Sequence, residues 1–193
     1  DGIRNGIEIA NRFKLKAVLV GANDAWRIAD EVKRAGYPVI INIQGGSTLG
    51  AVTPTNPNDP YDTPYVVPML LKKAGIKFAL QSEDNAHAFL TPIKAGIFGA
   101  YGMSTADLLR ALTLDSAEIL GMGATHGSLE PGKAGDIILT NGDPLESTTS
   151  VLGAFIGGRP VELVSRHTKL RDEYARRITK AERDLGPVQM VSR

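Results

Sequence analysis

The fold is decided by the stretch Lys16-Ala-Val-Leu-Val-Gly-Ala22, an apolar run that is too short and too rich in β-branched residues for a helix. Two runs of the same kind follow it, Pro38-Val-Ile-Ile-Asn-Ile-Gln44 and Lys77-Phe-Ala-Leu-Gln81. Each run predicts a buried strand. Because helical segments separate the runs, we expect parallel strands with right-handed crossovers, and therefore an α/β fold.

Helix signals lie before and between these runs. Asn23 is predicted to cap a helix that ends at Gly36, where a left-handed residue fits. Thr63 is predicted to cap a helix that has Pro64 in its first turn and ends at Gly75. One helix face is predicted ahead of the first run, from the spacing of Ile3, Ile7, Ala10 and Phe13.

A helical region is predicted over residues 88–121. Ser104 can cap a helix there, and Asp115 or Ser116 can cap a shorter one that stops at Gly121. The pattern then changes to short β-rich segments separated by turn residues, which predicts a small antiparallel unit. These segments are residues 136–140, 151–156 and 160–164, and an amphipathic helix follows from Arg166.

Composition excludes several classes of function. The chain has 193 residues with 22 basic and 21 acidic side chains, so a net charge of +1 provides no basic surface for nucleic acid. No apolar run approaches the ~18 residues of a membrane span. The absence of cysteine excludes disulfides, thiolate nucleophiles and cysteine-ligated zinc. We therefore expect neither a nucleic-acid nor a membrane partner, while a cytoplasmic and an exported location both remain open.

Polar residues follow each predicted strand. In parallel α/β folds the carboxyl ends of the strands form the edge where ligands bind. A carboxylate at such an edge needs a ligand, a metal or a covering loop to solvate it, which makes Asp84 the first candidate for a site. The candidates for substrate binding are His87, Asn23 and Gln44, and the long loop over residues 45–62 is a candidate specificity loop.

Four ordered motifs resemble the carboxyl-terminal signature of the amidohydrolase superfamily, and most closely its imidazolonepropionase-like branch. They are Ala111-Leu-Thr-Leu-Asp-Ser-Ala-Glu-Ile-Leu-Gly121, Gly127-Ser-Leu-Glu-Pro-Gly-Lys133, Gly135-Asp-Ile-Ile-Leu and Asn141-Gly-Asp-Pro-Leu145. The resemblance implies the carboxyl-terminal part of a (β/α)8 TIM barrel, of about three βα units, together with part of a small β-sandwich and a carboxyl-terminal helix. The implied divisions are residues 1–121, 122–165 and 166–193.

The resemblance also implies a metal-dependent hydrolase that cleaves amide, peptide or cyclic C–N bonds with a metal-activated water. Asp84 matches the aspartate that ends barrel strand eight, which ligates the metal and relays a proton. The implied cofactor of the intact protein is a divalent metal, and zinc is the metal that we expect. The position of the strand-six histidine falls at Gly21 or a neighbour, and the other metal ligands of the family would precede residue 1.

Three interpretations follow from the sequence. The first is a carboxyl-terminal segment that is inactive alone and takes a small amide or peptide substrate only when it joins the missing amino-terminal half of the protein, or another copy of itself. The second is a metal-free relative that serves as a binding or scaffold protein, which the departure at Gly21 favours. The third is an autonomous α/β domain that binds a small ligand where the strand order reverses.

Overall fold

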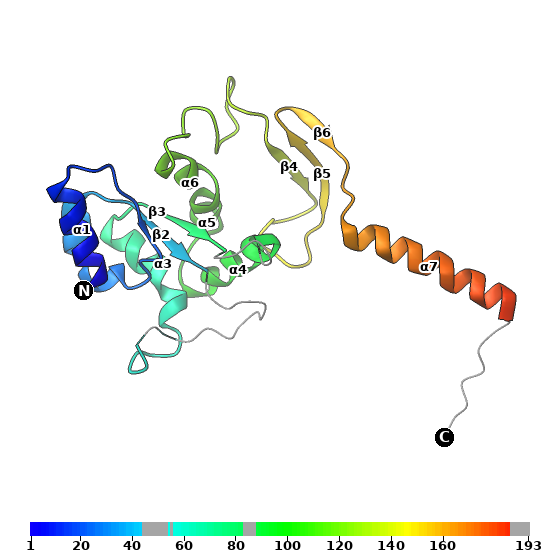
Figure 1. The fold of residues 1–193 in the computed structure, drawn as a ribbon, viewed down its shortest axis with the longest axis horizontal. Helices are drawn as coiled ribbons and strands as arrows, with labels where there is room; N and C mark the ends of the chain where they lie inside the picture. The colour runs from blue at the N-terminus through cyan, green and yellow to red at the C-terminus, as the bar shows by residue number, and fades with distance from the viewer. Residues whose placement is uncertain (44–53, 55, 83–87, 186–193) are drawn as a thin grey trace.

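The computed structural model describes residues 1–43, 54, 56–82 and 88–185. Within these residues the chain forms two three-stranded sheets and a series of helices (Figure 1). The first sheet is parallel with the order β1-β2-β3, and its register pairs Val39 with Phe78 and Asn42 with Gln81. The α/β prediction is therefore confirmed. The strands are β1 (Leu19–Val20), β2 (Val39–Asn42) and β3 (Phe78–Gln81).

Helices connect the strands and follow the sheet, as the spacing of apolar residues predicts. They are α1 (Gly2–Arg12), η1 (Ala25–Ile28), α2 (Ala29–Ala35), α3 (Thr63–Ala74), η2 (Ala88–Leu90), α4 (Thr91–Ile97), η3 (Phe98–Tyr101), α5 (Thr105–Leu112), α6 (Leu114–Ile119) and α7 (Arg166–Leu185). Gly36 and Gly75 end α2 and α3 with φ angles of 73° and 71°, as predicted for left-handed caps. The Ser104 hydroxyl accepts a hydrogen bond from the Asp107 amide at 3.2 Å, which confirms the predicted cap of α5.

Three predicted caps are wrong. Thr63 is already the first residue of α3, and Asp62 precedes it at the cap position. Asn23 does not cap a helix, because its side chain bonds to the neighbouring strand instead and η1 begins only at Ala25. The shorter helix α6 is preceded by Thr113 instead of Asp115 or Ser116. The Ser116 hydroxyl donates a hydrogen bond back to the Ala111 carbonyl at 2.7 Å, so its side chain is used inside the turn that joins α5 and α6.

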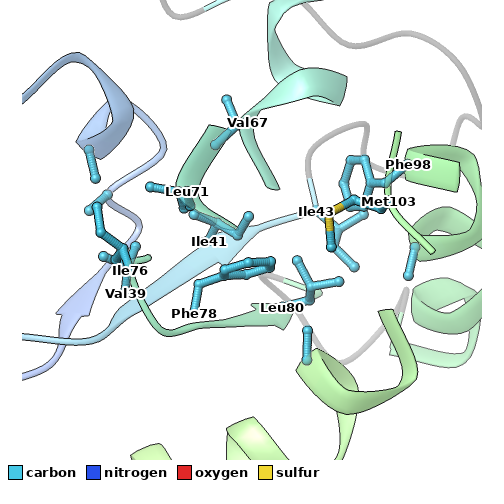
Figure 2. Close-up of a cluster of buried hydrophobic side chains, with 14 of the residues drawn as sticks. Val39, Ile41, Ile43, Val67, Leu71, Ile76, Phe78, Leu80, Phe98 and Met103 are labelled. Atoms are coloured by element: carbon cyan, nitrogen blue, oxygen red, sulfur yellow. The ribbon is translucent and has the colours of Figure 1, made fainter. Parts of the chain in front are cut away.

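The hydrophobic core lies between the parallel sheet and its helices (Figure 2). Alternate residues of β2 and β3 point into this core, and Val67 and Leu71 of α3 pack against them from one side. From the helices that follow β3, Phe98, Leu108 and Ala111 complete the cluster. The cluster residues in the strands are Leu19, Val39, Ile41, Phe78 and Leu80, and Ile43 directly follows β2. The same alternation leaves Ile40, Asn42 and Gln81 for the opposite face of the sheet.

The second sheet is antiparallel with the order β4-β5-β6, which confirms the predicted antiparallel pairing. Its strands are β4 (Ile137–Thr140), β5 (Val151–Ile156) and β6 (Arg159–Val161). The turn after β4 is fixed by Asp143, whose Oδ1 accepts a hydrogen bond from the Leu145 amide at 2.9 Å. Leu145 itself is 4% exposed and belongs to the core cluster. The turn therefore fastens the second sheet to the helices of the first.

The helix α7 extends away from the rest of the molecule, with Leu170, Tyr174 and Ile178 exposed along it (Figure 1). Within the described ranges, no helix has both the length and the apolar character needed to cross a membrane.

Candidate functional site

The carboxyl ends of β1, β2 and β3 lie at one edge of the parallel sheet, which is where the sequence places its candidate site. Asn42 and Gln81 are the last residues of β2 and β3, and they are paired in register. Both side chains are half-buried and lie on the face of the sheet opposite the hydrophobic core. The edge therefore carries two uncharged carboxamide side chains at neighbouring strand ends.

Asn23 joins this pair from the segment after β1. The Asn23 side-chain oxygen Oδ1 accepts a hydrogen bond from the Asn42 amide nitrogen at 3.0 Å. The chain reaches this position through Gly21, which has a φ angle of 70°, a conformation that residues with a Cβ rarely adopt. The Gly21 amide donates to the Ile40 carbonyl at 2.8 Å, which continues the pairing of β1 with β2 beyond Val20.

Hydrogen bonds link these three residues in a row, which we call the amide ladder (Asn23, Asn42 and Gln81). Gln81 Nε2 donates to Asn42 Oδ1, and the Asn42 backbone amide donates to Asn23 Oδ1. The ladder thus crosses all three strand ends with neutral groups. The bond to Asn23 fixes the orientation of its carboxamide, because a backbone N–H can only donate and the group that it meets must be the carboxamide oxygen.

An open cavity of about 590 Å³ lies beside the ladder, lined by Gly21, Asn23 and Asn42 from the strand ends and by Arg4 at the start of α1. The acidic residues Asp1 and Asp24 and the basic residue Arg27 also line it. The size falls within the range of about 300–1,000 Å³ that is typical of small-molecule sites.

The arginines at this cavity are already paired with carboxylates. The Arg4 guanidinium donates two hydrogen bonds to Glu31, at 2.9 and 2.7 Å. These bonds lower the pKa of the Glu31 carboxyl below its ordinary value of 4.5 and raise the pKa of Arg4. Arg27 contacts both Asp24 and Asp59, and it stacks over the Trp26 ring at 4.4 Å from the ring centre. The carboxylates around this cavity therefore outnumber its two arginines.

Only Asn23, among the site residues predicted from the sequence, lies in the part of the chain that the structure describes. Asp84, His87 and Gln44 lie outside the described residues, as does most of the loop over residues 45–62. Their assignments as metal ligand, catalytic group and substrate contacts stay predictions.

The described residues do not by themselves fit a metal ion. Across the ranges that the structure covers, no group of three histidine, cysteine, aspartate or glutamate side chains is arranged to hold one. Oxygen and nitrogen atoms of carboxamides, which dominate this edge, are poor ligands for zinc compared with imidazole or thiolate groups. Any metal in the intact protein needs its principal ligands from elsewhere.

Sequence reasoning missed Asn42 and Gln81. The signal that could have found them is the alternation within the two strands, since Val39 and Ile41 point to the core and Asn42 must then point away from it. A polar residue on the face opposite the helices, at the last position of a strand, marks the ligand edge of a parallel sheet.

Comparison with known proteins gives matches to one family. Residues 66–161 match the family model described as "Amidohydrolase family". A 72-residue stretch is 39% identical to the "Probable imidazolonepropionase" of Xenopus tropicalis and covers 36% of this chain and 17% of that protein. The Xenopus laevis protein of the same description is also 39% identical over 72 residues and is covered to 16%. The chain thus spans a small part of these relatives.

Solved structures give a broader match. An amidohydrolase from Thermotoga maritima superposes with a TM-score of 0.72 and 27% identity, over 83% of this chain and 40% of that one. An adenosine deaminase from Xanthomonas campestris with bound zinc superposes with a TM-score of 0.52 and 20% identity, over 82% of this chain and 40% of the other. The second likeness concerns the fold alone.

Proposed function

Because the chain belongs to the amidohydrolase superfamily, we propose that it is the carboxyl-terminal part of a metal-dependent hydrolase that cleaves amide, peptide or cyclic C–N bonds. The superposition on the Thermotoga maritima amidohydrolase carries this proposal, since it extends over 83% of the chain at 27% identity. The imidazolonepropionase relatives support the cyclic amide as one of the substrate classes.

The parallel sheet supplies the structural argument for a larger barrel. We assign β1, β2 and β3 to barrel strands six, seven and eight, residues 122–165 to a β-sandwich and residues 166–193 to a carboxyl-terminal helix and tail. In the described part of the chain, β1 pairs with β2 and has no strand on its other side. Three strands cannot close a barrel that needs about eight. The rest of the same protein would supply the five further strands, whereas a second copy of this segment would add three; either partner would pair with the open edges of the sheet at β1 and β3.

The proposed cofactor is a divalent metal, with zinc as the first candidate. When bound, such a metal supplies an acidified water as the nucleophile. We assign Asp84 as the one ligand and proton acceptor that this chain contributes, because it lies three residues after the end of β3 in the sequence. The described residues do not assemble a ligand set of their own, so the amide ladder is assigned to the substrate side of the site, and the segment alone is expected to be inactive.

The test uses the intact protein that contains this chain. Metal content is measured by elemental analysis, and hydrolysis is measured with an N-acyl amino acid, a dipeptide and a cyclic amide. We expect the Asp84→Asn variant to lose both the metal and hydrolysis. The matched control is Asp143→Asn, which keeps the side-chain oxygen that accepts from the Leu145 amide and should retain both. Retention of metal and turnover by Asp84→Asn would end the assignment.

A second candidate function is metal-free binding. The observation that favours it is the end of β1, where Gly21 has no side chain and Asn23 provides a carboxamide instead of a histidine. An intact protein that contains no zinc, iron or manganese after purification without chelators, yet binds small amides, would decide for the binding protein over the hydrolase.

A further inference from the structure

We infer that the amide ladder is a neutral subsite, in which Asn23 donates a hydrogen bond to an uncharged carbonyl of the ligand and contributes nothing to metal binding. The inference rests on the proposed function only in placing the ligand at the carboxyl edge of the sheet. It names the chemical group that this part of the site recognises and the residue that recognises it.

The orientation of the Asn23 carboxamide is the first step. Its Oδ1 accepts from the Asn42 backbone amide at 3.0 Å, and a backbone N–H has only a proton to offer. The oxygen must therefore face Asn42, and the two N–H groups of Nδ2 must face elsewhere. Within the described residues no group accepts a hydrogen bond from Asn23 Nδ2. Since Asn23 lines the cavity, its Nδ2 is placed to donate to a ligand there.

The rest of the ladder holds Asn23 in place. Asn42 is fixed from its other side by Gln81 Nε2, which donates to Asn42 Oδ1. All three residues are half-buried on rigid strand ends or directly after one. A donor that is held in this way loses little conformational freedom when a ligand binds, which favours recognition of a single acceptor atom.

The charges around the cavity disfavour an anionic ligand. The two arginines of its wall are engaged, Arg4 with Glu31 and Arg27 with Asp24 and Asp59. A carboxylate ligand would have to compete with these acidic partners, whereas an amide carbonyl needs only a donor. A cation such as zinc would meet the N–H side of the Asn23 carboxamide, which repels it.

The experiment is a titration of the intact protein, labelled with ¹⁵N in asparagine side chains, and the signals of the Asn23 side chain are followed. The probes are N-methylacetamide, sodium acetate and zinc alone. We expect N-methylacetamide to shift the Asn23 signals in a saturable way at millimolar concentration, acetate to bind about tenfold more weakly, and zinc to leave these signals unchanged. The Asn141 side chain is the internal reference, because its Oδ1 accepts from the Ser150 amide at 2.7 Å in the distant β4–β5 turn.

The decisive variant is Asn23→Asp, which keeps an oxygen for the Asn42 amide and replaces the outward donor by an acceptor. We expect the affinity for N-methylacetamide to fall about tenfold or more, because the hydrogen bond from Asn23 Nδ2 is lost and a carboxylate oxygen then repels the carbonyl oxygen of the probe. The melting temperature should stay near that of the parent. The control Asn141→Asp should bind the probe as the parent does.

Two results would overturn the inference: unchanged probe binding by Asn23→Asp, or a zinc-dependent shift of the Asn23 signals. Failure of the proposed hydrolase is a separate result. The hydrolase proposal is tested at Asp84. If Asp84→Asn kept its hydrolytic activity, that proposal would fail, and the result of the probe titration at Asn23 would still stand.

Discussion

Gly96 of α4 has a contact that only glycine permits. A Cβ at this position would lie 2.5 Å from the carbonyl oxygen of Leu145, in the turn that fastens the second sheet to the first. Real Cβ atoms do not approach a backbone oxygen so closely, so one of the two segments would have to move. This single contact couples α4, which follows the candidate site, to the turn after β4.

We predict that Gly96→Ala destabilises the protein by about 1–3 kcal/mol, the usual cost of overpacking, although alanine is the better helix former. Chemical denaturation monitored by circular dichroism measures the change. The matched control is Gly99→Ala in η3, where nothing lies within 4 Å of the added Cβ and the expected change is close to zero. Equal stability of the two variants would contradict the contact.

At the scale of elements, the start of α5 is held by a small charged cluster. Asp107 accepts hydrogen bonds from Lys72 of α3 and from the Ser104 hydroxyl, and the Ser104 hydroxyl oxygen also accepts from the Asp107 amide. The Lys72 bond, followed by that of Ser104, lowers the pKa of the Asp107 carboxyl below its ordinary value of 3.8. The cluster therefore caps α5 and links it to α3 at the same time.

The sign of the resulting pH dependence follows from this lowered pKa. The ionised Asp107 contributes its stability fully above the unfolded value near 3.8 and loses it as the pH falls through the lower folded value. We predict that Asp107→Asn lowers the melting temperature at pH 7 and flattens its decline below about pH 4.5. Melting curves over pH 2–7 measure both effects. Glu146→Gln, an exposed position in the turn after β4, should reproduce the parental curve.

At the scale of the whole molecule, the main feature is the exposed, unpaired edge of the parallel sheet at β1. Val20 of β1 is 61% exposed, and Ile9, Phe13 and Leu15 nearby in sequence are each more than half exposed. In the described residues no strand pairs with the outer side of β1. An apolar, unpaired edge strand favours association with another chain.

We predict that residues 1–193 expressed alone self-associate through this edge, and that Val20→Lys shifts them toward monomer in sedimentation experiments without changing the circular dichroism spectrum. A charged side chain on an edge strand disfavours pairing with a second strand. Val151→Lys, on the antiparallel sheet, is the control and should leave association unchanged. A cooperative, monomeric melt of the unmodified segment would instead support an autonomous α/β domain.

The sequence by itself determined the order of elements and most of their ends. Apolar runs of four to seven residues specify strands locally, and Gly36 and Gly75 end helices because they adopt left-handed backbone angles that need no tertiary contact. The parallel pairing of β1, β2 and β3 follows from the helices between them. The family resemblance likewise came from local motifs.

Tertiary structure alone decided what the polar side chains do. Asparagine is a residue type that commonly caps helices. In the folded chain, however, the Asn23 side-chain oxygen accepts a hydrogen bond from the Asn42 amide of β2, and this bond holds the side chain at the sheet edge. Gln81 meets Asn42 only because their strands are paired in register across 39 residues of chain. Hydrogen bonds between residues distant in sequence depend on how strands align, and a local pattern contains no information about that alignment.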